Sequence, residues 1–410
     1  MMERLLFAKA RWAVEREPVD VERSVEIEMA RLCETLRPGL RVAVTVGSRG
    51  IKDIPLILRS VVSFLSSRGA RPFLLSAMGS HGGGTPLGQR HILQGLGIRE
   101  ESLQVPIVVT GEALLLGQTE EGYRLFMDRQ ALEADAVLLV NRIKPHTSFQ
   151  GRIGSGLLKM LVVGLGKEAG AREVHRVGPQ KMEEAIISLS RLALERLNVL
   201  GGLAIIEDCY GTLKIESVSA EALLEREIQL FELSKAVSPR LPLQRCDLLI
   251  VLEMGKEISG TGLDPNVIGR FRIDGQKEPD MPRIERVVVL RPSPHFDGNA
   301  NGIGLADFTT KQVVEAIDWQ KTLTNVLSTG YLRRAFCPPF LPTEKEAVEF
   351  ALASLEKEPC EVSAVIVKNT TQLDTFWLSE TAFLAAEGVR RVGPFEALRF
   401  DPSGRLVIRE

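Results

Sequence analysis

The chain has 410 residues, of which 44% are hydrophobic and 25% charged, and this length exceeds what one hydrophobic core usually supports. We therefore expect two globular domains. The 51 Lys and Arg residues nearly balance the 53 Asp and Glu residues for a net charge of −2, which argues against the basic surface typical of proteins that bind nucleic acids or anionic membranes.

Apolar, β-branched segments alternate with segments of helical spacing along the first half of the chain. In chain order we predict a strand at 40–48, a helix at 54–67, a strand at 72–79, a helix beginning at Thr85-Pro86, a strand at 134–143, an amphipathic helix at 180–197 and a strand at 201–208. This alternation is typical of a doubly wound, mostly parallel sheet.

A second α/β pattern occupies the rest of the chain. A long helix is predicted at 219–237, and the segment SPRLPLQ after it has the composition of a linker. Strands are then predicted at 246–255, 285–291 and 362–369, and helices at 309–323 and 343–357. We therefore place the first domain at residues 1–238 and the second at residues 239–410, both of the α/β class.

The glycine-rich segment VVGLGKEAG at 162–170 invites a nucleotide-binding interpretation. Its glycines are spaced G-x-G-x-x-x-G, which is not the dinucleotide fingerprint. A phosphate-binding loop would need glycine at Leu161 and serine or threonine at Glu168. Both motifs fail, so the glycines either allow close backbone approach to a ligand or form a turn.

Three loops each follow a predicted strand and carry a polar side chain. Arg49 follows the first strand, His81 the second and His146 the third. The carboxyl ends of parallel strands meet at one edge of a sheet, where open α/β proteins bind ligands. Each residue alone has an ordinary explanation, as a solvated arginine or an incidental histidine, but together they indicate a ligand-binding edge.

A lysine in an apolar run is the most unusual feature of the sequence. Lys159 lies within LLKMLVV, between His146 and His175. Burying an unpaired ammonium group costs roughly several kcal/mol, so Lys159 requires a partner or a chemical role. In the second domain, Lys311 begins a predicted helix, where it either binds an anion across a cleft between the domains or is a solvated surface lysine.

Five residues, in a fixed order along about residues 40–180, resemble the nickel-dependent lactate racemase family: Arg49, His81, His146, Lys159 and His175. Lys159 and His175 are sixteen residues apart, as in that family. The resemblance implies that Lys159 is joined through a thioamide to a nickel-pincer nucleotide (pyridinium-3,5-bisthiocarboxylic acid mononucleotide nickel). It also implies that His175 is the protein's ligand to nickel, with Ser48 and Lys311 as further cofactor-binding residues. A lysine that ends in a neutral amide avoids the cost of burying a charge.

The same resemblance implies an isomerase that racemises or epimerises a 2-hydroxy carboxylic acid. The α-hydrogen of such an acid is poorly acidic, whereas its removal as hydride leaves a 2-keto acid. The reaction then needs a hydride acceptor, supplied by the cofactor, and a base for the hydroxyl proton. We expect His81 and His146 to be two bases, one for each enantiomer, and Arg49 to face charge near the reacting centre. The substrate is expected between the domains, with the second domain contributing to its site.

Three departures from the family bear on the substrate. Gly82 follows His81 where the family's lactate enzymes have arginine, and the thirteen-residue interval between His146 and Lys159 is longer than theirs. Phe308 and Lys311 match the lactate-contacting glutamine and lysine only loosely. A longer hydroxy acid, such as an aldonate, malate or an aromatic lactate, is therefore as good a candidate as lactate.

The remaining expectations concern partners, location and alternatives. We expect cofactor-biosynthesis enzymes as partners, no nucleic acid and no membrane, and we leave self-association open. Five scattered cysteines without a CxxC pair, together with the absence of a signal peptide or an apolar span, predict a cytoplasmic protein. The alternative is a non-catalytic or hydrolytic metal-binding protein that uses His146 and His175 without the pincer. An oxidoreductase with a free dinucleotide is disfavoured by the failed glycine motifs.

Overall fold

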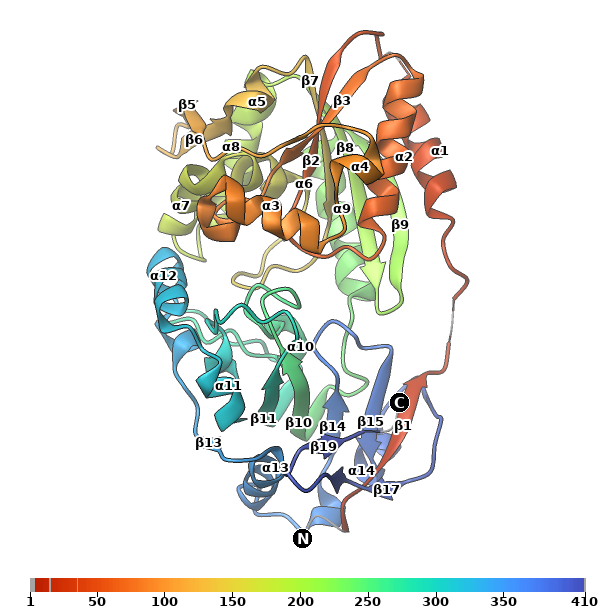
Figure 1. Cartoon of the computed structure of the whole chain (residues 1–410), viewed down its shortest axis with the longest axis vertical. Coiled ribbons are helices and arrows are strands. Elements are labelled where there is room, and N and C mark those ends of the chain that lie inside the picture. Colours follow the sequence, from red (N-terminus) through yellow and green to blue (C-terminus); the bar gives the residue numbers. More distant parts are fainter. Residues whose placement is uncertain (1–3, 15, 35, 409–410) are drawn as a thin grey trace. The chain divides into compact units, whose positions relative to one another are not determined.

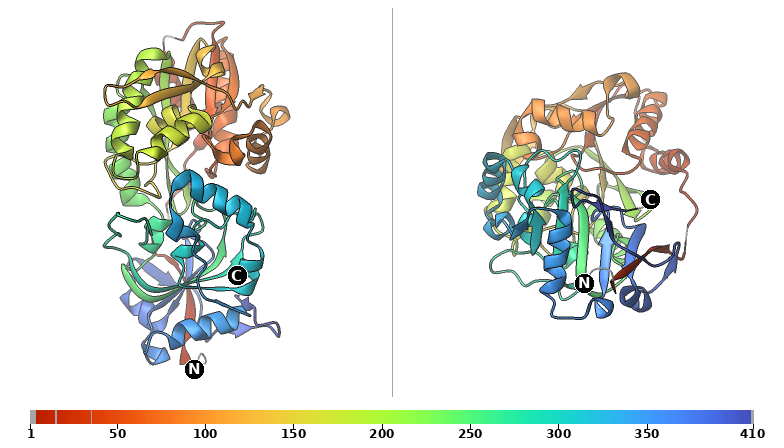
Figure 2. Two further views of the ribbon diagram at one scale, coloured as in Figure 1. Left: turned by 90° about the vertical axis from the view of Figure 1, so that its left-hand side faces the viewer. Right: turned by 60° about the horizontal axis from the view of Figure 1, so that its bottom comes forward.

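The computed structural model describes residues 4–14, 16–34 and 36–408. The chain divides into two compact units (Figure 1): the N-terminal unit is Pro18–Ser238, and the C-terminal unit combines Met1–Glu17 with Pro239–Glu410. Each unit is built on a sheet whose central strands are parallel (Figure 2). The predicted class, two α/β domains, is confirmed.

The N-terminal unit contains a six-stranded sheet in the order β4-β3-β2-β7-β8-β9, parallel except for β9. Its strands are β2 (Arg41–Val46), β3 (Arg71–Ser76), β4 (Ile107–Val108), β7 (Ala136–Arg142), β8 (Val199–Asp208) and β9 (Gly211–Ser219). A separate antiparallel hairpin consists of β5 (Ala113–Gln118) and β6 (Arg124–Asp128). The helices are α1 (Val21–Leu32), α2 (Ile54–Ser67), α3 (Pro86–Gly95), α4 (Glu100–Leu103), α5 (Arg129–Leu132), α6 (Leu157–Lys159), α7 (Lys167–Arg176), α8 (Met182–Arg196) and α9 (Leu223–Val237). A 3₁₀ turn, η2 (His81–Gly84), and a π-helical turn, η3 (Met160–Gly164), complete this unit.

The strands of this sheet are apolar on both faces because helices cover both. In β7, Val137 and Leu139 belong to one core, and Leu138 and Val140 belong to the other. Residues of α6 to α9 belong to the first core, and residues of α1, α2 and α3 belong to the second. Burial on both faces explains the nearly continuous apolar runs from which these strands were predicted.

The strand order of the N-terminal sheet reverses between β2 and β7. From β2 the chain continues to β3 and β4 on one side, and it then crosses to β7 and β8 on the other. Such a switch point, at the carboxyl ends of the strands, is the usual ligand site of an open α/β sheet. The loops that follow β2, β3 and β7 carry Arg49, His81 and His146.

The C-terminal unit contains a nine-stranded sheet in the order β13-β12-β11-β10-β14-β15-β1-β16, with β17 also paired to β1. Its strands are β1 (Leu6–Trp12), β10 (Arg245–Met254), β11 (Arg283–Pro292), β12 (Phe308–Thr310), β13 (Phe340–Leu341), β14 (Ala364–Val367), β15 (Thr375–Ser379), β16 (Val389–Arg391) and β17 (Glu396–Ala397). A small hairpin consists of β18 (Arg399–Phe400) and β19 (Leu406–Val407). The helices are α10 (Pro265–Ile268), α11 (Lys311–Glu315), α12 (Trp319–Thr329), α13 (Glu344–Ala353) and α14 (Glu380–Ala385). No helix in the part of the chain described is long and apolar enough to cross a bilayer.

Two sequence-based assignments differ from the structure. The predicted first domain begins at residue 1, but β1 pairs antiparallel with β15 and β16 in the C-terminal sheet, because its apolar side chains complete the cores of that unit. The helix predicted at 309–323 is broken. Its first residues end β12, and Asp318 caps a new helix, α12, by accepting a hydrogen bond from the Lys321 N–H.

The place of β1 in the C-terminal sheet can be tested by one charged substitution. Ala10 is 0% exposed, so Ala10→Asp buries an unpaired carboxylate, at a cost of roughly several kcal/mol. We expect hydrogen exchange to accelerate in β14 and β15 while β2 and β7 keep their protection. Ala13→Asp, at an exposed position, is the matched control. Equal loss of protection in both units would contradict this assignment of β1.

Candidate functional site

Three predicted site residues lie in loops after adjacent strands. Arg49 follows β2, His81 follows β3 and His146 follows β7, and these strands are neighbours in the order β3-β2-β7. The fourth element is the helical segment from α6 to α7, which carries Lys159 and His175. The residues meet at the carboxyl edge of the N-terminal sheet, beside its switch point.

His81 is held between Ser48 and Arg49. Arg49 Nη2 lies 3.1 Å from His81 Nε2, and Ser48 Oγ is hydrogen-bonded to His81 Nδ1. A guanidinium group can only donate, so Nε2 is the acceptor and the ring carries its proton on Nδ1, which it donates to Ser48. A second proton on Nε2 would place an imidazolium against the arginine. This arrangement therefore favours a neutral imidazole with its lone pair on Nε2.

His146 and Lys159 form the second pair of the site. The buried His146 ring stacks on Phe149, with centroids 4.4 Å apart. The backbone N–H of Ser148 donates to His146 Nδ1 at 3.1 Å, so a neutral ring carries its proton on Nε2. That nitrogen lies 2.8 Å from Lys159 Nζ. With this tautomer the Nε2–H donates to Lys159, which accepts with a free lone pair, as a neutral amine.

The surroundings of Lys159 favour the same protonation state. Its helix turns its apolar residues, including Leu158 and Met160, into the core, and the lysine itself is half-buried. Desolvation, together with the positive charges of Arg49 and Lys144, lowers the pKa of Lys159 to about 7. The lysine in the apolar run is thus an amine that loses its proton near neutral pH.

His175 lies near the end of α7 and has an unused nitrogen. Its Nδ1 is buried and has no hydrogen-bond partner among the described residues. Burial and the nearby charge of Lys159 lower the pKa of His175 to about 4, so the ring is neutral at physiological pH. A neutral imidazole with an unpaired buried nitrogen is the form that binds a metal ion.

Lys311 belongs to the C-terminal unit and is the first residue of α11. Its side chain is exposed and lies 3.5 Å from Glu315, one turn along the same helix. An exposed pair of this kind contributes little to stability. The contacts of Lys311 are those of a solvated surface lysine. Its predicted role in a cleft between the domains stays a prediction.

Two residues that sequence reasoning missed shape the site. Lys144 pairs with Ser155 in an isolated antiparallel bridge, with two backbone hydrogen bonds of 2.8 Å, and this folds the chain back so that His146 reaches Lys159. Glu227, from α9, is buried, and its carboxylate accepts a hydrogen bond from the Leu158 N–H at 2.9 Å. Burial raises the pKa of Glu227 to about 7. The Glu227 contact has no local signal in the sequence, because Glu227 and Leu158 are 69 residues apart.

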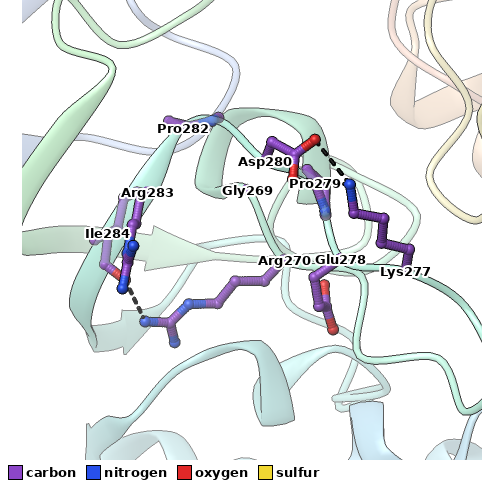
Figure 3. A pocket seen from close by; sticks show the side chains of 9 residues that line it. All are labelled: Gly269, Arg270, Lys277, Glu278, Pro279, Asp280, Pro282, Arg283 and Ile284. Atoms are coloured by element: carbon purple, nitrogen blue, oxygen red, sulfur yellow. Dashed lines mark hydrogen bonds and ion pairs between the residues drawn. The ribbon is translucent and has the colours of Figure 1, made fainter.

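A cavity of about 410 Å³ lies elsewhere, in the C-terminal unit (Figure 3), and is lined by Gly269, Arg270, Lys277, Glu278, Pro279, Asp280, Pro282, Arg283 and Ile284. Its charged groups are largely engaged: Arg270 donates to the Ile284 carbonyl at 2.9 Å and pairs with Asp307 at 2.8 Å. Lys277 pairs with Asp280 at 2.9 Å. The cavity contains none of the predicted site residues.

Within the described ranges, no three His, Cys, Asp or Glu side chains are grouped so that they could hold a metal ion. The pincer interpretation predicts a single protein ligand, the imidazole of His175, beside sulfur and carbon donors of the cofactor.

The protonation of Lys159 can be measured on the cofactor-free protein. We expect the rate at which trinitrobenzenesulfonate labels Lys159 to rise through a midpoint near the pKa of about 7, far below the ordinary lysine value of about 10.4. Peptide mass spectrometry measures the labelling, with the exposed Lys277 as reference for the reagent. Arg49→Met removes a nearby positive charge and should raise the midpoint. A midpoint near 10 in the parent protein would contradict the neutral amine.

Three comparisons with known proteins bear on this site. One protein family, described as "Domain of unknown function (DUF362)", matches residues 45–222. That range includes Ser48, Arg49, His81, His146, Lys159 and His175 but not Lys311. A search of curated protein sequences found no match.

Two solved structures are similar over nearly the whole chain. The lactate racemase apoprotein from Thermoanaerobacterium thermosaccharolyticum has a TM-score of 0.51 at 12% identity, covering 90% of this chain and 99% of its own. A protein from Thermotoga maritima has a TM-score of 0.56 at 14% identity, covering 88% of this chain and 99% of its own. At such identities the likeness concerns the fold, and the chain shares the fold of lactate racemase apoprotein.

Proposed function

We propose that this protein is a racemase or epimerase of a 2-hydroxy carboxylic acid that works with a nickel-pincer nucleotide joined to Lys159. The observation that carries the proposal is the hydrogen-bond pattern at Lys159, which favours a neutral amine in the cofactor-free protein. The buried Nδ1 of His175, which has no hydrogen-bond partner among the described residues, supports the proposal because it is available to bind nickel. The fold shared with lactate racemase apoprotein is consistent with this chemistry.

The residues present fit the cofactor. Joining an amine to a thiocarboxylic acid as a thioamide releases water and needs no oxidant or reductant, but it requires the lone pair of the amine. Lys159 offers that lone pair toward His146. His175 would supply the imidazole ligand, and Ser48 would contact the cofactor beside His81.

Joining Lys159 to the cofactor would also change the state of His146. An amide or thioamide nitrogen has no lone pair to accept a hydrogen bond. The Nε2–H of His146 would therefore lose its acceptor at Lys159 and become available to a substrate oxygen. His81 offers the opposite group, a lone pair on Nε2. One ring can accept and the other can donate, as a reaction that inverts a centre requires of two acid–base groups.

When bound, the pincer nucleotide would be held by Lys159 and His175 and would supply the hydride-transfer chemistry that interconverts the 2-hydroxy acid and its 2-keto acid. Arg49 would face the negative charge of the substrate, since its planar group binds carboxylates through two parallel hydrogen bonds. His81 and His146 would exchange the hydroxyl proton, each serving one enantiomer. Lys311 of the C-terminal unit is the candidate for a further contact with the acid or the cofactor.

The proposal extends to substrate, partners and location. Gly82 after His81 leaves the reacting edge without the arginine of the family's lactate enzymes, so a longer acid such as an aldonate, malate or an aromatic lactate is included beside lactate. Enzymes that make the cofactor are the expected partners, and the cytoplasm is the expected location.

The cofactor assignment is tested by mass and metal. Protein produced together with the cofactor-making enzymes should carry a mass adduct on the Lys159 peptide and about one nickel per chain. Lys159→Ala should lose the adduct and the nickel, whereas His175→Ala should keep the adduct and lose most of the nickel. Racemase activity in a protein whose Lys159 is unmodified would overturn the assignment.

The two-base assignment is tested by single replacements of the histidines. His81→Ala and His146→Ala should each lower sustained racemisation by about 10²-fold or more, the usual contribution of a positioned base. Each variant should still form bound 2-keto acid from one enantiomer only, and the two variants should prefer opposite enantiomers. The measurement is keto-acid trapping from each pure enantiomer. Racemisation of both enantiomers by His81→Ala at the parent rate would refute the role of that histidine.

A further inference from the structure

A chain of buried polar groups lies beneath the His81 loop, and the proposed chemistry does not use it. Its members are Ser76, Gln89 and Asp128, each 0% exposed, and Lys167, 1% exposed. Lys167 is the lysine of the glycine-rich segment whose nucleotide motifs fail. Buried polar groups of this kind need a full set of hydrogen-bond partners. Those partners indicate the role of this hydrogen-bonded network.

Lys167 is the anchor of this chain. Its ammonium group lies 2.8 Å from Asp128 Oδ2 and 3.0 Å from Ser76 Oγ, and it also donates to the Ser76 carbonyl. These contacts use all three of its N–H donors. Asp128 is held in turn by the Thr110 hydroxyl at 2.6 Å and the Gln130 N–H at 2.7 Å.

The direction of the hydrogen bonds is fixed by the lysine. Because an ammonium can only donate, Ser76 Oγ accepts from Lys167 and gives its own proton to Gln89 Oε1, at 2.9 Å. The amide of Gln89 is thereby oriented, and its Nε2 donates to the carbonyls of Gly79 at 3.2 Å and His81 at 3.4 Å. The chain runs one way, from the ion pair to the backbone of His81.

The same anchor begins the helix that carries His175. Lys167 is the first residue of α7, with the positive φ of 53° that few residues other than glycine adopt. Its side chain ties this helix to the last residue of β3, five positions before His81. Gly79 adds a second tie, since its N–H donates to the Gly164 carbonyl at 3.2 Å, in the turn that follows Lys159.

Stability alone is a weak reason to keep such a group. A buried ion pair can often be replaced by apolar side chains of similar volume without loss of stability. Apolar side chains could not orient the amide N–H donor of Gln89, and they could not tie β3 to α7 through hydrogen bonds. Small errors in the placement of reacting groups are costly, about 10²-fold for a displacement of about 1 Å.

We propose that Gln89, oriented by Lys167 through Ser76, is a positioning residue that sets the place of His81 relative to His175. The inference rests on the proposed function for its catalytic meaning, but its structural part concerns the cofactor-free protein alone. Gln89 acts through the backbone of His81 and touches neither substrate nor cofactor. Two substitutions break the chain at different links: Gln89→Met removes the donor, and Ser76→Ala disconnects Gln89 from Lys167.

The first readout uses the cofactor-free protein. With ¹⁵N-labelled histidine, the His81 ring of the parent should show one protonated and one unprotonated nitrogen, as its contacts with Ser48 and Arg49 require. Gln89→Met should convert this to an averaged signal and speed amide exchange across residues 78–84. Ser234→Ala is the matched control, because Ser234 is also buried and donates to a backbone carbonyl, that of Phe231 at 3.1 Å, in α9.

The second readout separates positioning from simple loss of packing. In the loaded enzyme, Gln89→Met should lower kcat about 10-fold or more and leave KM within about two-fold, while Ser234→Ala changes neither. The double variant with Ser76→Ala should lose no more than Gln89→Met alone, since both break one chain, whereas independent packing defects would add. If Gln89→Met does not fold, Ser76→Ala serves in both readouts.

Failure of this inference is distinguishable from failure of the proposed function. An unchanged His81 ring signal in both Gln89→Met and Ser76→Ala overturns the inference, whatever the activity. A changed signal with unchanged kcat in a racemising parent also overturns it. If the parent proves not to racemise any 2-hydroxy acid, the proposed function fails, and the ring signal of the cofactor-free protein still decides whether the chain positions His81.

Discussion

The hydrogen bond from the Ser148 backbone to His146 is the constraint on which the chemistry of this site depends. It occupies the lone pair of Nδ1 and so places the ring proton on Nε2, facing Lys159 at 2.8 Å. A neutral imidazole has only one acceptor nitrogen, so its ring cannot accept hydrogen bonds both from the Ser148 N–H and from an ammonium group at Lys159. This tautomer favours the neutral amine of Lys159. Burial, together with the positive charges of Arg49 and Lys144, acts in the same direction and lowers the pKa of Lys159 to about 7.

Lys159 and Lys167 illustrate how the partners of a buried lysine determine its role. Lys167 is more deeply buried than Lys159, yet it pairs with the carboxylate of Asp128 and with both oxygens of Ser76. Burial lowers the pKa of Lys167, while Asp128 acts in the opposite direction. Among the described residues no carboxylate forms an ion pair with Lys159, whose partner is an imidazole. The first lysine is suited to hold structure, and the second to react.

Much of this arrangement could be predicted from the sequence, because its signals are local. Apolar runs predict strands such as β2 and β7, and the polar residues just after them mark one sheet edge. The structure brings Arg49 and His81 to 3.1 Å, and His146 and Lys159 to 2.8 Å. The sheet that β1 joins, the cap that Glu227 provides and the pairing of Lys167 could not be predicted. These contacts join residues that are distant in sequence, 91 positions apart for Lys167 and Ser76. A local sequence pattern predicts that a segment is a strand or a helix, but it does not identify the distant segment with which it pairs.

The glycines of the failed nucleotide motif have a packing role that sequence spacing could not distinguish from a ligand contact. A Cβ at Gly166 would lie 2.2 Å from the Val162 carbonyl, and one at Gly164 would lie 2.7 Å from that of Ala77. Glycine lets the π-helical turn after Lys159 approach the strand end that leads to His81. Backbone contacts between packed segments are stiffer than contacts between long side chains, and π-helical turns are frequent at functional sites. Main-chain packing therefore sets the distance between the strand end that leads to His81 and the turn that follows Lys159.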